Sequence, residues 1–584
     1  MAETLDSLKV RIRELEKEVE RWKSQVKNVR YGLNWMDVPE AFDKDSEDKI
    51  PILEEVAEKS VDAEGPLAGR PSHMIIEGDN YHALTCLNYT HRGKIDVIYI
   101  DPPYNTGSDG FTYKDKRFLT EFPDGQKVPK EHPLRHSYWL SFMEKRLKLA
   151  KNLLRDKGVI FISIDDNEQA NLKLLCDKVF GEGNFIADVI WNSRKSVSND
   201  AVVSLNHNYT LIYTKNITQF NKYKSDFKLV DEGVGFSNPD NDSRGLWKAD
   251  PFDSPGIRPN LTYPIKNPIT GVEYLPPEGR CWRTGKNEYE MFLADNRIVF
   301  GKTGKSKPQL KRFLSEAQEK GLTPKSIWDD CGTATNGTQE IQEIFGEKIF
   351  DTPKPTALLQ RIIQISTSTR DSLPSTVLDF FAGSGTTLHA TLNLNKEDDG
   401  NRQCILVQQA EGDNNICENV TYERNRRVMC GYTNAKGENV EGLGGSLKYY
   451  KTGFVGKHQS KNANDADKVE LAEKAGCLIA LAENTLDTIK VPEAAKGFWQ
   501  IYSDNAEKKK RYTCIYHNGD YGKVSDFVAK IDELRTTDKK SKFAVYVFSW
   551  NSPDFFENEF DDLKNIEIKA IPKPILEIYK ALNG

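Results

Sequence analysis

Residues 95–104 read IDVIYIDPPY, a run of mostly apolar residues followed by an acid, two prolines and a tyrosine. The apolar run has the composition of a strand that is buried on both faces, and such strands are typical of parallel sheets. The two prolines cannot continue the hydrogen-bond ladder, so they end the strand. We therefore expect Asp101 and Tyr104 at the carboxyl end of a parallel strand, where open α/β sheets bind their ligands.

Helical and strand patterns alternate on both sides of this run, which predicts a parallel α/β sheet. We expect strands at about 74–77, 159–164, 376–379 and 404–408, and helices at about 81–88, 138–154 (ended by Gly158) and 356–367. A region rich in proline and asparagine separates the two blocks and lacks helical periodicity. The α/β core is therefore predicted to be split by an insertion.

The second block carries a glycine-rich turn, DFFAGSGTT, at residues 379–387. Gly383 and Gly385 would let a ligand approach the backbone at the amino terminus of the next helix, where backbone amides suit a carboxylate. The turn lacks the rest of the dinucleotide fingerprint, and no lysine follows it as in a phosphate-binding loop. Neither NAD nor ATP is favoured.

The chemistry available at residues 101–104 is that of an amino group undergoing alkylation. The Asp101 carboxylate and the Pro102 carbonyl can accept hydrogen bonds from an amino group and stabilise the positive charge that develops on it. Tyr104 offers a flat face on which a base flipped out of a duplex can stack. The alternative is that these residues form only a strand-ending turn.

The order of the two motifs, Asp-Pro-Pro-Tyr first and Phe-x-Gly-x-Gly later, resembles the beta class of DNA amino-methyltransferases. Several longer segments are similar to the modification (Mod) subunit of type III restriction-modification systems. They are IEGDN (76–80), IYIDPPYNTG (98–107), GVIFISIDD (158–166), the NPDND and RPNLTYP runs within 238–264, DTPKP (351–355) and the glycine-rich turn.

This resemblance implies a Rossmann-like α/β methyltransferase fold, S-adenosyl-L-methionine as methyl donor and adenine N6 as acceptor. The implied catalytic residues are Asp101, Pro102, Pro103 and Tyr104. The implied cofactor site comprises Asp79 and Asn80 near the adenine, Lys354 near the methionine end, and Asp379, Phe380, Phe381, Ala382, Gly383, Ser384, Gly385 and Thr386. We add Glu411 as a candidate for the ribose diol, although it could equally be a solvent-exposed glutamate, and Asn105 as a DNA contact. Cytosine N4 or RNA methylation, or a non-catalytic DNA-recognition subunit, are the alternatives.

We expect six segments. They are an amphipathic, coiled-coil-like helix (1–34), an acidic connector (35–72), the first core block (73–215), a target recognition domain (216–345), the second core block (346–440) and an α+β carboxyl-terminal domain (441–584). The first has apolar residues in a heptad pattern, which favours self-association over packing on its own domain. From 43 to 64 nine acidic and three basic residues predict a solvated connector.

The stretch from Arg297 to Lys325 holds eight basic and two acidic residues, although the net charge of the whole chain is −6. Such a local cluster can contact phosphates, and the alternative is an ordinary solvated face. We expect DNA contacts from Lys302, Lys305, Lys307, Lys311 and Arg312.

The remaining composition predicts a cytoplasmic protein, because no apolar run approaches a membrane span and the nine cysteines form no CxxC pair. No metal spacing is present, and we expect no metal. The expected partners are double-stranded DNA, a second copy of the chain, and a separate restriction (helicase-nuclease) subunit.

Overall fold

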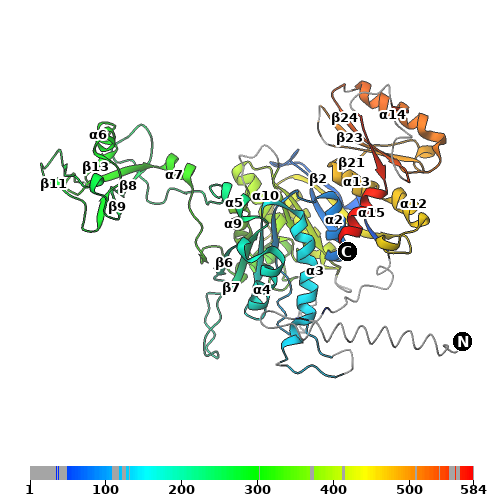
Figure 1. Cartoon of the computed structure of the whole chain (residues 1–584), viewed down its shortest axis with the longest axis horizontal. Coiled ribbons are helices and arrows are strands. Elements are labelled where there is room, and N and C mark those ends of the chain that lie inside the picture. Colours follow the sequence, from blue (N-terminus) through cyan, green and yellow to red (C-terminus); the bar gives the residue numbers. More distant parts are fainter. Residues whose placement is uncertain are drawn as a thin grey trace. The chain divides into compact units, whose positions relative to one another are not determined.

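The computed structural model describes residues 35, 37, 49–107, 117–121, 126–130, 132–301, 303–367, 374–410, 415–504, 506, 509–537, 539–550, 559–560 and 566–582. The predicted helix at 1–34 lies outside these residues and stays a prediction. The chain divides into two compact units (Figure 1): unit 1 comprises 1–223 with 325–584, and unit 2 comprises 224–324.

Unit 1 is built on a mixed sheet of eleven strands. Six neighbouring strands, from β20 to β5 in the order below, run parallel, and β1 and β7 flank them antiparallel. In sheet order the strands are β1 (Ile50–Glu55), β20 (Gly445–Val455), β3 (His73–Glu77), β17 (Gln403–Gln408), β16 (Thr376–Asp379), β4 (Ile95–Ile100), β5 (Leu154–Ile164), β7 (Asn208–Thr214), β6 (Phe185–Trp191) and β15 (Ile327–Trp328), with β2 (Val61–Ala63) beside β20.

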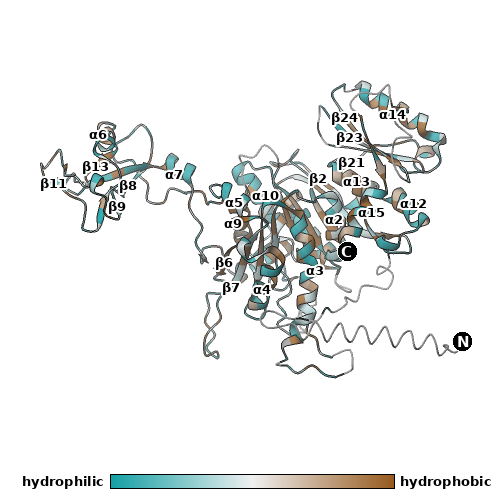
Figure 2. Ribbon diagram, viewed as in Figure 1, coloured by the Kyte–Doolittle hydropathy of each residue, from teal (hydrophilic) through white to brown (hydrophobic). Residues whose placement is uncertain are grey.

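The central strands are buried along their whole length, as their apolar composition predicts. Two sets of mutually packed helices accompany the sheet: α2 (Asn80–Thr90), α3 (Ser137–Leu153) and α4 (Gln169–Phe180), and then α8 (Ala334–Phe345), α9 (Thr356–Ser366), α10 (Thr386–Asp398) and α11 (Glu423–Cys430). Figure 2 shows brown on the interior strands and teal patches on α3 and α4. The predicted parallel α/β core is confirmed.

One predicted boundary is wrong. Helix α3 ends at Leu153, and β5 begins at Leu154, so Gly158 lies inside the strand and does not end the helix. A Cβ at Gly158 would lie 2.9 Å from the Arg155 carbonyl oxygen and 3.0 Å from that of Ile95. The glycine marks close contact between neighbouring strands rather than a helix end.

The acidic segment at 43–64 is not a solvated connector throughout. Its residues 50–55 form β1, which pairs with β20 in the register Ile50 to Val455. Ile50, Ile52 and Leu53 are fully buried in the core of unit 1. The four-residue apolar run outweighs the surrounding carboxylates because burying it stabilises the sheet edge.

The carboxyl-terminal segment also contributes to the core sheet, because β20 lies between β1 and β3. After β20 come α12 (Asp465–Lys474), α13 (Gly476–Glu483) and a second, five-stranded sheet. This sheet consists of β21 (Asp487–Thr488), β22 (Trp499–Ser503), β23 (Arg511–Tyr516), β24 (Lys542–Phe548) and β25 (Ile566–Ile571), with α14 (Val524–Thr537) between β23 and β24. The last helix, α15 (Lys573–Leu582), and α13 both pack on α2. The core therefore extends beyond residue 440.

Unit 2 contains small antiparallel sheets around an aromatic core of Phe252, Trp282, Tyr289 and Phe300. Its elements are β8 (Trp247–Pro251), β9 (Asp253–Pro255), β10 (Ile265–Lys266), β11 (Glu273–Tyr274), β12 (Arg280–Trp282), α6 (Lys286–Ala294), β13 (Ile298–Val299), β14 (Gln309–Phe313) and α7 (Leu314–Lys320). It is narrower than the expected domain at 216–345, because β15 and α8 belong to unit 1.

Candidate functional site

The two sequence motifs meet because β4 and β16 are adjacent parallel strands, with Val97 opposite Val377 and Ile98 opposite Leu378. Their carboxyl ends place Asp101 and Asp379 at the same edge of the sheet. A cavity of about 310 Å³ opens there, a size within the range of small-molecule sites. Two motifs that are far apart in the sequence thus line one site.

Both carboxylate oxygens of Asp101 have partners. The Tyr104 hydroxyl donates to Oδ1 at 2.7 Å, and Lys354 Nζ lies 2.5 Å from Oδ2. The ammonium also lies over the Tyr104 ring, 5.2 Å from its centroid. Burial and the nearby Asp101 carboxylate raise the pKa of Tyr104 well above its usual value, so the phenol stays protonated and acts as a donor.

The turn after Asp101 is held from the next helix. Trp139 of α3 is fully buried, and its indole Nε1 donates to the Pro103 carbonyl at 2.7 Å. The proline pair thus has a fixed backbone path, and Asp101 and Tyr104 keep their relative positions.

Asp379 lies on the floor of the cavity and is almost completely buried. It accepts hydrogen bonds from the Thr387 hydroxyl at 2.5 Å and the Phe381 amide at 3.0 Å. Burial nevertheless raises the pKa of Asp379 to about 7. This carboxyl group therefore titrates near neutral pH, and a cation beside it would favour the ionised form.

The glycine turn needs glycine at two positions. Gly383 and Gly385 have φ values of +51° and +74°, which other residues rarely adopt. A Cβ on Gly385 would collide with Asn425 Nδ2 and lie 3.0 Å from the Thr421 carbonyl oxygen. A Cβ on Gly383 would lie 3.2 Å from Phe350, on the cavity side.

A buried arginine braces this turn and was not predicted from the sequence. Arg424 of α11 donates to Ser384 Oγ at 3.1 Å and Thr386 Oγ1 at 2.7 Å, and it pairs with Glu340 at 3.2 Å. Burial lowers the pKa of Arg424 to about 10, with Glu340 opposing the shift. The turn is therefore supported from two helices.

Most of the predicted catalytic and cofactor residues line the cavity: Asn80, Asp101, Pro102, Pro103, Tyr104, Lys354, Asp379, Phe380, Phe381, Ala382, Gly383, Ser384 and Thr386. Gly385 does not line the cavity, but its positive φ shapes the turn that does. Asp79 instead caps α2 by accepting from the Tyr81 amide at 2.8 Å, and it faces Arg146 at 3.3 Å. Glu411 lies outside the described residues.

The cavity has further walls that the sequence did not predict. They include Arg117, Trp191, Asn208, Phe350 and Gln408. Gln408 ends β17 and accepts from the Gly383 amide at 2.7 Å through Oε1. Phe350 immediately precedes the DTPKP segment, which contains the predicted site residue Lys354. This position in the sequence is the one feature that could have pointed to Phe350 as a cavity residue.

Asn105 is corrected from DNA contact to structural support. It is 1% exposed, its Nδ2 donates to Glu168 Oε1 at 2.6 Å, and its Oδ1 accepts from the Arg117 amide at 2.8 Å. Glu168 also pairs with His136 Nδ1 at 2.5 Å. These contacts tie the segment after Tyr104 to the sheet edge.

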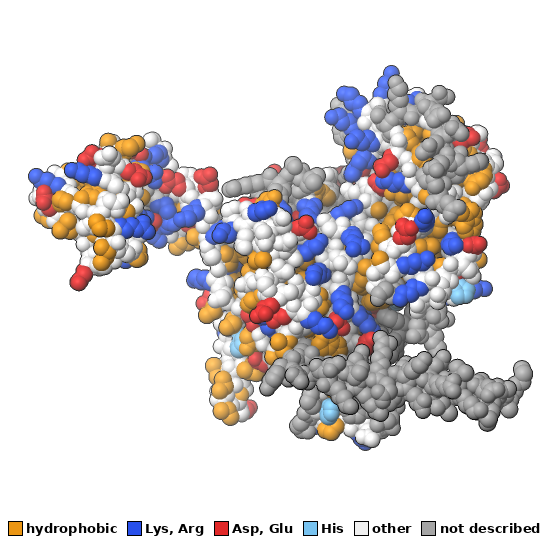
Figure 3. Space-filling view, viewed as in Figure 1, with side chains coloured by type: hydrophobic (Ala, Val, Ile, Leu, Met, Phe, Trp, Pro, Cys, Tyr) orange, Lys and Arg blue, Asp and Glu red, His pale blue; other side chains and the backbone are white. Residues whose placement is uncertain are grey.

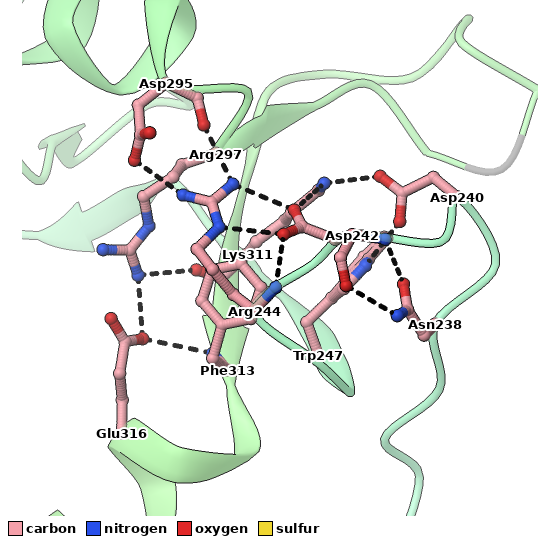
Figure 4. Close-up of polar contacts among 10 residues, drawn as sticks. All are labelled: Asn238, Asp240, Asp242, Arg244, Trp247, Asp295, Arg297, Lys311, Phe313 and Glu316. Carbon is pink, nitrogen blue, oxygen red and sulfur yellow. Dashed lines mark hydrogen bonds and ion pairs between the residues drawn. The ribbon is translucent and has the colours of Figure 1, made fainter.

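Lys311 is corrected in the same way. Its side chain is fully buried in unit 2, and its Nζ lies 2.5 Å from Asp240 and 2.9 Å from Asp242 (Figure 4). Hydrogen bonds from Arg244 and Lys311 hold the pKa of Asp242 far below its usual value. Lys311 therefore anchors the NPDND loop and has no surface from which to reach a phosphate.

The neighbouring basic residues are at the surface of unit 2. Lys305 is exposed, Lys307 is about half exposed and lies 3.4 Å from Asp253, and Arg312 lies 3.3 Å from Asp250. Lys302 lies outside the described residues. Lys305 and Lys307 are thus the exposed members among the described candidates for a phosphate contact.

Two features are absent from the described part of the chain. No cluster of three or more His, Cys, Asp or Glu side chains there could hold a metal ion. No helix in that part is long and apolar enough to cross a membrane.

Comparison with known proteins gives one family and several relatives. The sequence model of the DNA methylase family matches residues 95–419. The Mod subunit of the type III restriction-modification enzyme StyLTI of Salmonella typhimurium is 36% identical over 73% of this chain and 67% of its own length. The EcoPI Mod subunit of Escherichia phage P1 is 35% identical over 58% of each chain. The type II methyltransferase M.KpnI of Klebsiella pneumoniae is 35% identical over 59% of this chain and 82% of its own length.

Two solved structures give distant likenesses. The PvuII DNA methyltransferase (cytosine-N4-specific) aligns with a TM-score of 0.28 at 14% identity, covering 64% of this chain and 96% of that one. A complex of M1.HpyAVI with SAM aligns with a TM-score of 0.25 at 14% identity, covering 57% and 94%.

Proposed function

Because the chain belongs to the DNA methylase family, we propose that it transfers a methyl group from S-adenosylmethionine to N6 of a flipped adenine at a specific DNA sequence. The observation that carries this proposal is the shared cavity of Asp101 and the glycine turn at the ends of β4 and β16. Type III Mod subunits and M.KpnI among the relatives support DNA as the substrate.

The cavity residues fit S-adenosylmethionine. Asp379 supplies a carboxylate for a cationic ligand, and the turn at Gly383 keeps the backbone open where a Cβ would approach Phe350. The side-chain amide of Asn80 forms part of the cavity wall. Its Nδ2 donates a hydrogen bond to the Phe380 carbonyl at 3.0 Å, which fixes its orientation. The cofactor supplies an electrophilic methyl group, and these residues orient it.

The residues after β4 suit the acceptor. Asp101 accepts a hydrogen bond from the adenine amino group and stabilises the charge that develops there, with the Pro102 carbonyl as second acceptor. The Tyr104 ring stacks on the flipped base. For this to happen, one oxygen of Asp101 must exchange its present partner, Tyr104 or Lys354, for the amino group.

The inserted segment 216–345 is the proposed target recognition domain. Its support is a separate compact unit at 224–324 with exposed basic residues such as Lys305. The anchored NPDND loop gives this unit a defined surface.

We propose that two copies of the chain associate, in part through the heptad pattern of residues 1–34. Because relatives are Mod subunits of type III restriction-modification enzymes, we also propose a separate restriction subunit as a partner. Ile12→Asp with Leu15→Asp should lower the mass measured by light scattering. An unchanged mass with an unchanged circular dichroism spectrum would remove the segment from association.

Long-read sequencing of DNA from cells that express the chain tests the function and reads out the recognition sequence. We expect N6-methyladenine at one motif, and its loss in cells that express Asp101→Ala. Methylcytosine, or no modification with the protein folded and abundant, would overturn the proposal.

A further inference from the structure

A narrow loop leaves the core sheet between β6 and β7. Residues 192–207 form two legs that run away from the strands (Figure 1). Hydrogen bonds connect the two legs. The Arg194 amide donates to the Asn206 carbonyl at 3.1 Å, and Asn206 Nδ2 donates to the carbonyls of Arg194 and Ser196 at 2.9 Å each. Further out, the Ser198 amide donates to Ser204 Oγ at 3.0 Å. These hydrogen bonds join the two legs of the loop, so the loop projects with a defined conformation.

The outer part of this loop exposes four aliphatic side chains, beside the polar residues Asn199 and Asp200. Val202 is fully exposed, and Val197, Val203 and Leu205 are 69%, 74% and 62% exposed. Figure 3 shows hydrophobic side chains gathered at the end of this projection. Several aliphatic side chains held in water on one short loop indicate a contact site.

The base of the loop is part of the cavity wall. Trp191 and Asn208, which flank the loop, both line the cavity of Asp101. Trp191 Nε1 donates to the Gly332 carbonyl at 2.9 Å, and the Ser193 carbonyl accepts from the amide of Ala334, another lining residue, at 3.0 Å.

Strand direction puts the loop on the side where the substrate enters. Strand β7 is antiparallel to β5, and β6 is antiparallel to β7, so the β6–β7 connection leaves from the edge at which β4 and β5 have their carboxyl ends. A leg of about eight extended residues reaches at most about 29 Å, which exceeds the depth of a DNA groove, about 8 Å.

We propose that the loop 192–207 is a wedge that enters the DNA duplex beside the target adenine, with Val202 and Val203 filling the space left by the flipped base. The inference rests on the proposed function. Aliphatic side chains inserted between base steps offset the lost stacking. Arg194 and Lys195 on the same loop are exposed and meet the phosphates. A narrow tip of a few aliphatic residues, continuous with the base-binding cavity, fits a gap in a base stack better than a broad protein surface.

The test uses the full chain with a duplex that carries the recognition sequence. The variant Val202→Ser with Val203→Ser is compared with Leu174→Gln, which changes an exposed aliphatic residue on α4. Single-turnover methylation and the fluorescence of 2-aminopurine at the target position report transfer and flipping. A second duplex places an abasic site opposite the target adenine, which removes its pairing partner.

We expect the double variant to methylate the paired duplex about ten- to hundredfold more slowly, with a weaker 2-aminopurine signal, because flipping costs a few kcal/mol of stacking. The abasic duplex should restore its rate to near that of the wild type, and the affinity for S-adenosylmethionine should not change. Leu174→Gln should behave as the wild type throughout.

A wild-type rate for the double variant on paired DNA would overturn the wedge and leave the loop as a surface for a partner protein. A slow rate that the abasic duplex does not restore would also overturn it. Absence of methylation by the wild-type chain would overturn the proposed function itself, and the wedge with it.

Discussion

Lys354 Nζ lies 2.5 Å from Asp101 Oδ2, in the place where an amino group bound to that carboxylate would lie. The lysine side chain is 11% exposed and the aspartate side chain 26% exposed, so the pair is poorly screened by water. The lysine therefore holds Oδ2 while the Tyr104 hydroxyl holds Oδ1, and together they orient the carboxylate.

We expect Lys354→Met to slow single-turnover methyl transfer about ten- to hundredfold because Asp101 loses its positioning partner. Lys354→Arg, which keeps a cation, should lose less. Calorimetry of S-adenosylmethionine binding shows whether Lys354 positions Asp101 or binds the cofactor. A large loss of cofactor affinity with an unchanged transfer rate would make Lys354 a cofactor ligand instead.

Asp101→Ala should slow transfer by about two to four orders of magnitude while DNA and cofactor binding persist, because the acceptor aimed at the developing charge is gone. Asp101→Asn keeps an oxygen without its charge and should also be severely impaired. Rapid-quench measurement with saturating enzyme isolates this step. Near-normal rates for Asp101→Ala would reduce residues 101–104 to a structural turn.

Tyr104→Phe removes the hydrogen bond to Asp101 Oδ1 but keeps the ring, so we expect a decrease in rate of about three- to tenfold. Tyr104→Ala also forfeits about 1 to 3 kcal/mol of base stacking and should be much slower. The ratio of the two variants' methylation rates on the same duplex measures the contribution of the Tyr104 ring without its hydroxyl. Equal activities would exclude stacking on Tyr104.

The pKa of Asp379, raised by burial to about 7, predicts a pH-dependent cofactor affinity. A cationic ligand favours the ionised carboxylate, so binding below pH 7 releases a proton, and affinity should rise with pH up to about 7 and then level off. The limiting slope is about tenfold per pH unit. Calorimetry in buffers of different ionisation enthalpy measures the released proton. Asp379→Asn should bind without it, and an equal proton release from that variant would contradict the assignment.

Substitution of Lys305 should affect DNA binding, whereas substitution of Lys311 should affect the stability of unit 2. Lys305→Ala should reduce the slope of log affinity for DNA against log salt by about 0.9 and leave folding intact. Lys311→Met removes the buried cation shared by Asp240 and Asp242, and only Asp242 keeps another basic partner, Arg244, so unit 2 should lose stability. Hydrogen exchange over 224–324 detects this loss.

The control for Lys311 adds Asp240→Asn to Lys311→Met, which should recover part of that stability because the carboxylate left without a basic partner is then neutral. Unchanged exchange in Lys311→Met would refute the anchoring role.

The sequence predicts those parts of the molecule that depend on local pattern. The strand predicted at 95–100 is correct in both bounds, because five apolar residues and one aspartate come before Asp101 and two prolines, which end the hydrogen-bond ladder. The position of each motif at the carboxyl end of a strand followed from the sequence pattern and from the rule that ligands bind there.

What the sequence did not predict depends on partners that are distant along the chain. A count of basic residues cannot distinguish Lys305, which meets solvent, from Lys311, whose partners lie about seventy positions away. Likewise, β1 was hidden in an acidic stretch because its partner, β20, comes some 390 residues later.

The position of β20 between β1 and β3 also governs how the protein can be made. During synthesis, β1 and β3 leave the ribosome long before residues 445–455 do, and until then neither has its neighbour on that side. A message truncated anywhere after the glycine turn but before residue 445 would encode both catalytic motifs, yet release a chain with an unpaired strand edge that invites aggregation. The stretch of gene that contains the chemistry is thus shorter than the stretch needed for a soluble product.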